Sequence, residues 1–163
     1  MASEKGRGST FWVQLPLPPD TPVEWNAPET HYGRFDFSGF RVLVAEDHAV
    51  SQHSMAKLLE KNGMTVDVVG TGQEAVARCS ARRYSMILMD CQMPDMDGYE
   101  ATRRIREMES DEGKHTPVIA ITANAMATNR DRCREAGMDD YVVKPFVPEE
   151  LIVCIASHLF RKA

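Results

Sequence analysis

Three absences limit what this chain of 163 residues can be. Its four cysteines, Cys79, Cys91, Cys133 and Cys154, show no paired Cys-x-x-Cys spacing, so neither a disulfide framework nor a zinc site is predicted. An apolar run of about 18 residues and a signal sequence are both missing, so no membrane span is predicted. The net charge of −5 argues against a nucleic-acid surface, which needs a basic footprint. We therefore expect a protein of the reducing cytoplasm that contacts neither nucleic acid nor, through this chain, a membrane.

The composition is that of a globular protein, with 43% hydrophobic and 26% charged residues. The length suits one domain, since domains usually have about 100–150 residues, plus an appendage. The first 39 residues form this appendage, because they hold most of the prolines, both tryptophans and no helical periodicity. Within them, residues 9–17 are predicted to form a strand that the following proline cluster ends.

From residue 40 onward, short apolar runs alternate with longer amphipathic stretches. The runs are residues 41–45, 65–69, 85–89, 117–122 and 141–143, and most are apolar throughout, as strands buried on both faces are. The stretches predict helices over 50–62, 73–81, from 98 onward, 127–136 and from Pro148, with Gly63 as a left-handed stop after the first. The pattern predicts an α/β fold, a doubly wound five-stranded parallel sheet in the flavodoxin-like order 2-1-3-4-5.

Acidic residues follow the first and third predicted strands, where that strand order places a ligand site. Glu46 and Asp47 come after one strand and Asp90 after the other. Like charges this close oppose each other unless a cation neutralises them, and Mg²⁺ prefers carboxylates, water and phosphate oxygens. Helix capping is the alternative for a single aspartate at such a turn. Three converging carboxylates favour a divalent metal site.

A hydroxyl and an ammonium follow the last two strands. Thr122 ends the fourth and Lys144 follows the fifth, so both are expected at the same edge of the sheet as the carboxylates. Taken singly, Thr122 could be an ordinary strand residue and Lys144 a solvated lysine. Together with a metal ion they would neutralise the charge of a transferring phosphoryl group. The combination predicts a phosphoryl site at Asp90.

Four motifs, in order, make residues 40–163 closely resemble the receiver domain of two-component response regulators. They are VLVAED at 42–47, MDCQMPDMDG at 89–98, AITANA at 120–125 and DDYVVKPF at 139–146. The resemblance implies that Asp90 accepts the phosphoryl group and that Lys144 holds it. It implies Mg²⁺ or Mn²⁺ bound by Asp90, Asp47, the Gln92 backbone carbonyl and, through water, Glu46. It further implies a switch pair, Thr122 and Tyr141, and a Lys144-Pro145 bond that is often cis in the family.

The chain resembles in particular the receivers of hybrid sensor histidine kinases. Residues 6–17, GRGSTFWVQLPL, are similar to the last glycine-rich turn and strand of a histidine-kinase ATP-binding domain. We therefore expect residues 1–17 to be the remnant of that domain, 18–39 a linker and 40–163 the receiver. The resemblance implies a phosphohistidine domain as donor and a histidine phosphotransfer protein as partner. The parent would then be a sensor kinase, with this part cytoplasmic and not itself an enzyme.

Three rival interpretations remain open. A phosphatase of the haloacid-dehalogenase type needs a second aspartate two residues after the first, where this chain has Gln92. A flavodoxin would share the topology, but the acidic crevice would repel a flavin phosphate. A stand-alone receiver, or an interaction module that works without phosphorylation, would have the same fold, although the complete set of Asp90, Thr122 and Lys144 argues against the module.

Overall fold

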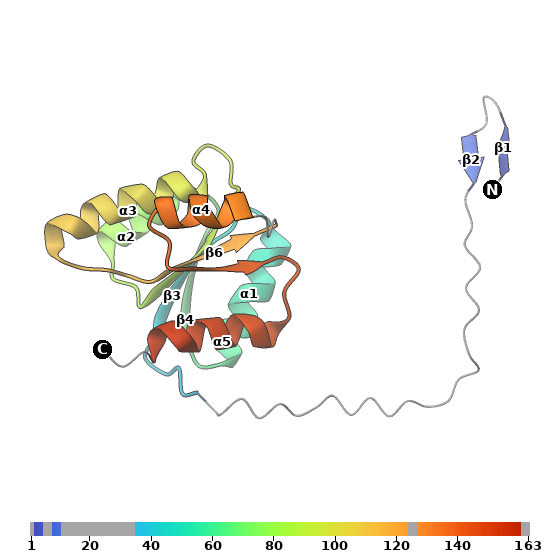
Figure 1. Ribbon diagram of the computed structural model, residues 1–163. Coiled ribbons are helices and arrows are strands. Elements are labelled where there is room, and N and C mark those ends of the chain that lie inside the picture. The colour runs from blue at the N-terminus through green and yellow to red at the C-terminus, as the bar shows by residue number, and fades with distance from the viewer. Residues whose placement is uncertain (1, 5–7, 11–34, 124–126, 161–163) are drawn as a thin grey trace. The chain divides into compact units, whose positions relative to one another are not determined.

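The computed structural model describes residues 2–4, 8–10, 35–123 and 127–160 (Figure 1). The chain divides into two compact units, Met1–His31 and Tyr32–Ala163. In the first, strands β1 (Ala2–Glu4) and β2 (Gly8–Thr10) pair antiparallel, with Ala2 opposite Thr10. The predicted strand over residues 9–17 overlaps β2 at its first two residues, and the rest lies outside the described residues. The partner strand β1 was not predicted.

The second unit is built on a five-stranded parallel sheet. Its strands are β3 (Arg41–Ala45), β4 (Thr65–Val69), β5 (Met86–Asp90), β6 (Val118–Thr122) and β7 (Asp140–Val143). Their order is β4-β3-β5-β6-β7, and every neighbouring pair is parallel. In chain order this is 2-1-3-4-5, so the predicted fold is confirmed.

In the described part of this unit, four helices connect these strands and a fifth follows the last strand. They are α1 (Ala49–Lys61), α2 (Gly72–Ala81), α3 (Gly98–Glu112), α4 (Ala127–Glu135) and α5 (Pro148–Leu159). Every predicted helix and strand of this unit is present, with boundaries within one residue of the prediction. Residues 124–126, before α4, lie outside the described residues.

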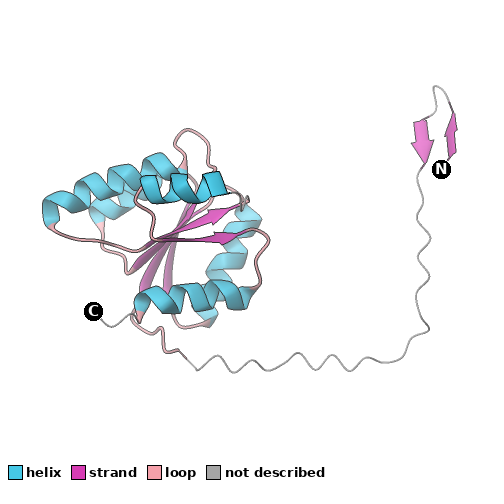
Figure 2. Ribbon diagram, viewed as in Figure 1, coloured by secondary structure: helices cyan, strands magenta, loops and turns pink. Residues whose placement is uncertain are grey.

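The helices cover both faces of the sheet (Figure 2). Helices α1 and α5 pack on one face, while α2, α3 and the end of α4 pack on the other, and a separate apolar core fills each layer. The central strand β5 is buried over its whole length, as its apolar sequence predicts. The edge strands β4 and β7 are only partly buried, because each has one neighbour.

Local sequence sets where several of these helices begin and end. Thr71 caps α2, its hydroxyl accepting from the Glu74 N–H at 3.2 Å. The Asp97 carboxylate caps α3, accepting from the Glu100 N–H at 2.8 Å. Gly63 follows α1 with φ +92°, the left-handed conformation that glycine adopts without strain, as predicted.

The packed body extends back into the segment predicted as linker. Phe37 is only 1% exposed and belongs to the same core as α1 and α5. Its ring lies 5.4 Å from that of Phe160, which follows α5, so the chain before β3 is fixed to the end of the domain. None of the described helices is both long and apolar enough to span a bilayer.

Candidate functional site

Three carboxylates meet at the ends of β3 and β5. Glu46 and Asp47 directly follow β3, and Asp90 is the last residue of the adjacent strand β5. Oxygen atoms of the three lie within 4.8 Å of one another. Glu46 is 1% exposed and Asp90 7%, whereas Asp47 is exposed, so the cluster opens to solvent on one side. The predicted convergence is therefore present.

Lys144, directly after β7, reaches across β6 into this cluster. Its Nζ lies 2.5 Å from Glu46 Oε2 and 2.7 Å from Asp90 Oδ2. Burial raises the pKa of Glu46, and the negative charge of Asp90 adds to this, although Lys144 acts in the opposite direction. Burial alone would lower the pKa of Lys144, but its hydrogen bonds to Asp90 and Glu46 outweigh it and the pKa is raised. The ammonium therefore stays charged between two carboxylates.

The backbone around Asp90 fixes the orientation of its carboxylate. The Gln92 N–H donates to Asp90 Oδ1 at 2.8 Å, which leaves Oδ2 facing Lys144. The Cys91 N–H donates to the Ile121 carbonyl, continuing the pairing of β5 with β6 one residue beyond the strand. The predicted metal contact of the Gln92 carbonyl stays a prediction.

Gly98 allows the loop after Asp90 to fold back tightly. A Cβ at residue 98 would lie 2.1 Å from the Asp90 carbonyl oxygen and 2.9 Å from the Met89 side chain. No residue with a side chain fits there unless the backbone moves. Close approach, and not a positive φ, is therefore the reason that residue 98 is glycine. The Lys144-Pro145 peptide bond is cis, as expected.

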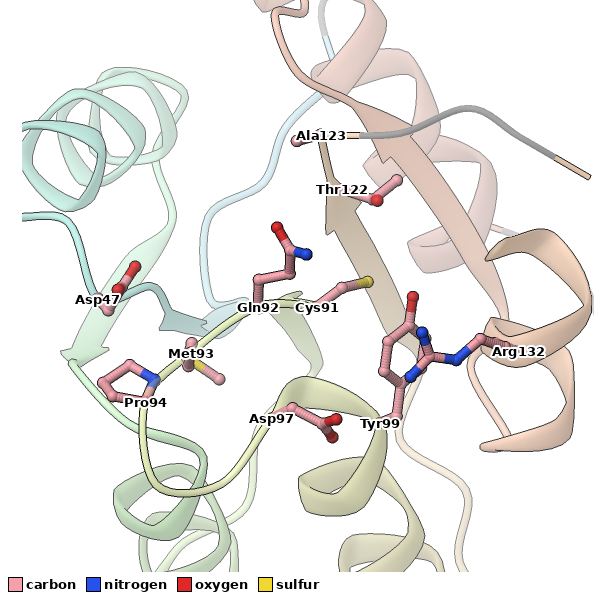
Figure 3. Close-up of a pocket in the computed structure, with 10 residues that line it drawn as sticks. All are labelled: Asp47, Cys91, Gln92, Met93, Pro94, Asp97, Tyr99, Thr122, Ala123 and Arg132. Atoms are coloured by element: carbon pink, nitrogen blue, oxygen red, sulfur yellow. The ribbon is translucent and has the colours of Figure 1, made fainter. Parts of the chain in front are cut away.

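The predicted switch residues lie on neighbouring strands but in different surroundings. Thr122, at the end of β6, is 4% exposed and lines the cleft beside the site (Figure 3). Tyr141 is opposite Ala120 in the pairing of β6 with β7 and is partly buried against the core of the α2–α3–α4 layer. The Arg130 guanidinium lies 4.7 Å from its ring centroid. Only Thr122 therefore belongs to the immediate site.

A cleft of about 590 Å³ lies beside the acceptor loop, lined on one side by residues 91–94 and on the other by the end of β6 and by α4. Its wall includes Arg132, whose guanidinium lies 4.2 Å from the Tyr99 ring centroid (Figure 3). The sequence suggests that Arg130, Arg132 and Arg134 form a solvated helix face. All three are exposed as predicted, although the first two also place their guanidinium groups over aromatic rings.

One positioning contact has no signal in the sequence. Gln52 Nε2, on α1, donates to the Glu46 carbonyl oxygen at 2.5 Å and so ties the acidic turn to the helix that follows it. A glutamine on a partly exposed helix face is common, and only the fold reveals its partner.

The cluster suits a hard divalent cation. Its donors are carboxylate oxygens only, two of them from buried residues, and such cations prefer oxygen ligands. Lys144 compensates part of the negative charge, and an ion could share the rest.

The comparisons with known proteins agree with this geometry. Residues 42–156 match the model of the response regulator receiver domain. The chain belongs to this family. It is 40% identical over 126 residues to hybrid signal transduction histidine kinase I of Dictyostelium discoideum, and 36% identical over 152 residues to histidine kinase 1 of Arabidopsis thaliana. These alignments cover 74% and 73% of this chain but only 7% and 13% of the two kinases.

Solved receiver domains have the same fold. One is the receiver domain of a sensor histidine kinase of Pseudomonas aeruginosa PAO1, with a magnesium ion coordinated in its active-site cleft. It is 41% identical, with a TM-score of 0.69, and the match covers 76% of this chain and 99% of that one. The chemotaxis protein CheY4 of Vibrio cholerae is 26% identical, with a TM-score of 0.69 over 74% of this chain and 98% of that one.

Proposed function

We propose that Asp90 of this receiver domain accepts a phosphoryl group from the phosphohistidine of a kinase, in a reaction that needs Mg²⁺ or Mn²⁺. The contact of Lys144 Nζ with both Glu46 and Asp90 carries this proposal. A lysine that served only to pair with charge would not need to reach from β7 to the acceptor on β5. A phosphoryl group on Asp90 Oδ2 would meet that ammonium directly.

Each residue of the site would have a separate role in the transfer. The Gln92 N–H holds Asp90 Oδ1, so the carboxylate is oriented before the donor arrives. Glu46, Asp47 and Asp90 would hold the metal ion, together with the Gln92 carbonyl. When bound, that ion supplies positive charge to the phosphoryl oxygens. Lys144 adds a fixed cation and the Thr122 hydroxyl a nearby hydrogen-bonding group.

Phosphorylation would then act through Thr122 and Tyr141. It adds about −1.5 to −2 charges and three acceptor oxygens at Asp90, and these would draw the Thr122 hydroxyl inward. Tyr141, two residues earlier along the neighbouring strand, would move into the vacated space and leave the Arg130 guanidinium. The surface of α4, β7 and α5 would change as a result.

The chain's place in a larger protein is also a proposal. We infer that residues 1–17 are the end of a kinase ATP-binding domain, 18–39 a linker and 40–163 the receiver of a cytoplasmic hybrid sensor kinase. The alignment with hybrid signal transduction histidine kinase K of Dictyostelium discoideum supports this, since it covers 95% of this chain at 36% identity. The receiver would be a phosphoacceptor and not a kinase. It would pass its phosphoryl group to a histidine phosphotransfer protein.

Phosphorylation of the purified chain by a small-molecule donor tests the central claim. Acetyl phosphate with Mg²⁺ should add one phosphoryl group per chain, measured by intact-mass spectrometry, and EDTA should prevent the addition. Asp90→Ala should accept none. Asp95→Asn is the matched control, because Asp95 is an exposed aspartate in the same loop and asparagine tolerates its φ of +64°, and it should be modified as the wild type is. A wild-type chain that stays unmodified, or modification that survives Asp90→Ala, would contradict the proposal.

A further inference from the structure

A second group of metal-ligating side chains lies away from the phosphoacceptor site. Asp140, at the start of β7, and Cys154 and His158, both on α5, each place one ligand atom within 4.8 Å of the other two. Cys154 and His158 are four residues apart, so they lie on the same face of the helix. Asp140 is opposite Ile119, whose side chain belongs to the core on the α5 face of the sheet.

The atoms already have the spacing of a small coordination site. Asp140 Oδ2 lies 3.0 Å from His158 Nε2 and 3.7 Å from Cys154 Sγ. In a tetrahedral zinc site with bonds of about 2.0–2.3 Å, neighbouring ligand atoms are about 3.3–3.7 Å apart. Only a small outward shift of His158 would be needed. The other carboxylate oxygen of Asp140 accepts from the Tyr141 N–H at 2.8 Å, which fixes the direction of the carboxylate.

We propose that Asp140, Cys154 and His158 bind a divalent cation of the zinc class, with solvent in the fourth position. Thiolate, imidazole and carboxylate together suit Zn²⁺ or Co²⁺, whereas Mg²⁺ prefers oxygen ligands. The Asp140 side chain is 40% exposed and that of His158 12%, so an ion can enter from the Asp140 side. None of its three ligands belongs to the phosphoacceptor cluster, so the proposal does not rest on phosphorylation at Asp90.

Binding requires one proton to leave. Burial raises the pKa of Cys154 to about 12, and the nearby Asp140 carboxylate adds to this, so without metal the sulfur is a thiol at neutral pH. When the metal–sulfur bond forms, the thiol proton passes to the buffer, and the proton that His158 Nε2 shares with Asp140 moves to Nδ1 so that Nε2 can bind the ion. Burial acts to raise the pKa of Asp140, but hydrogen bonds from His158 and the Tyr141 N–H outweigh it and the pKa is lowered. Asp140 is therefore already an ionised carboxylate and loses no proton when the metal binds.

A metal ion here would join α5 to the edge strand of the sheet. Asp140 immediately precedes Tyr141 on β7, and Cys154 and His158 belong to the middle and last turns of α5. The ion would fix how these two elements lie against each other. Sequence spacing does not reveal the site, since its cysteine lies in no Cys-x-x-Cys pair.

Cobalt titration of the metal-stripped chain, with Mg²⁺ in excess to fill the carboxylate site, tests the proposal. One equivalent of Co²⁺ should give a thiolate-to-metal charge-transfer band that Zn²⁺ abolishes. Cys154→Ser should remove the band and His158→Gln should weaken Co²⁺ binding at least about tenfold. Cys79→Ser, at a half-buried thiol on α2, is the matched control and should keep the band. The band should also persist in Asp90→Ala.

A wild-type measurement covers the case in which a variant fails to fold. Zn²⁺ should slow alkylation of Cys154 at least about tenfold, read cysteine by cysteine by peptide mass spectrometry, and leave Cys79 unaffected. A wild-type chain without a thiolate band, a band unchanged by Cys154→Ser, or alkylation of Cys154 indifferent to Zn²⁺ would each overturn the proposal.

Discussion

Lys144 Nζ and Asp90 Oδ2 lie 2.7 Å apart, although β6 separates the strands that carry them. Lys144 directly follows β7, and its backbone N–H donates to the carbonyl of Thr122, the last residue of β6, at 2.7 Å. Its side chain therefore passes the end of β6 to reach Asp90. One backbone hydrogen bond thus places Lys144 relative to Thr122, and one side-chain contact places it relative to Asp90. The three residues proposed to act on the phosphoryl group are fixed by the same strand ends.

Lys144→Gln should slow phosphorylation of Asp90 by acetyl phosphate about a hundredfold, the usual effect of removing one preorganised charge donor. The cause is the loss of a fixed cation beside the developing negative charge. The rate can be measured by intact-mass spectrometry at saturating Mg²⁺. Lys57→Gln is the control, since Lys57 is exposed on α1, and its rate should equal that of the wild type. Equal rates for both variants would contradict the role given to Lys144.

The sequence predicts most of this site because its residues lie at the last position of a strand or directly after it. Once the strand order is known, Glu46, Asp90 and Lys144 must meet at one edge, whatever the helices do. Arg130 is different. It lies on an exposed helix face rich in arginine, and such a face looks the same whether or not a ring from β7 lies beneath it. The group of Asp140, Cys154 and His158 is equally hidden, because its geometry depends on how α5 is turned against the sheet.

Gly98→Ala should destabilise the domain by at least about 1–3 kcal/mol, as forced overpacking does. The new Cβ would lie 2.1 Å from the Asp90 carbonyl oxygen, and a backbone atom cannot give way without moving the acceptor. The urea unfolding midpoint measures the effect. Gly70→Ala is the matched control, since its Cβ would have only ordinary contacts of 3.7 and 3.9 Å. It should change stability by less than about 0.5 kcal/mol. Equal losses for both variants would exclude close approach as the cause.

The free energy of unfolding of the domain should fall at alkaline pH, in part because Tyr84 then loses its proton. Its hydroxyl donates to Asp67 Oδ2 at 2.8 Å, and burial, this hydrogen bond and the negative charge of Asp67 raise the pKa of Tyr84 to about 12. The folded state thus keeps the phenol proton to a higher pH than the unfolded state, in which the pKa is about 10. This contribution is complete below pH 10 and is lost as the pH rises towards 12.

Comparison of the wild type with Tyr84→Phe isolates this contribution. The buried thiols also titrate late, since burial raises the pKa of Cys79 and Cys91 to about 12, so both proteins should lose stability above pH 9. The free energy of unfolding should fall more steeply with pH for the wild type between about pH 10 and 12, because only the wild type has the phenol of Tyr84. Urea unfolding at a series of pH values measures both curves. Parallel curves would show that Tyr84 does not hold its proton in the folded state.

Tyr141→Ala should uncouple the distant surface from the acceptor while leaving phosphorylation intact. Beryllofluoride with Mg²⁺ mimics the phosphoryl group, and in the wild type it should shift amide NMR signals both around Asp90 and along β7 and α5. In Tyr141→Ala the shifts around Asp90 should remain and those along β7 and α5 should largely vanish, because no ring is left to move into the space beside Thr122. Tyr84→Phe is the control, because Tyr84 contacts Asp67 on β4, the edge strand opposite β7. This variant should show both the shifts around Asp90 and the shifts along β7 and α5. If Tyr141→Ala kept the full response along α5, a route other than this tyrosine would have to carry the signal.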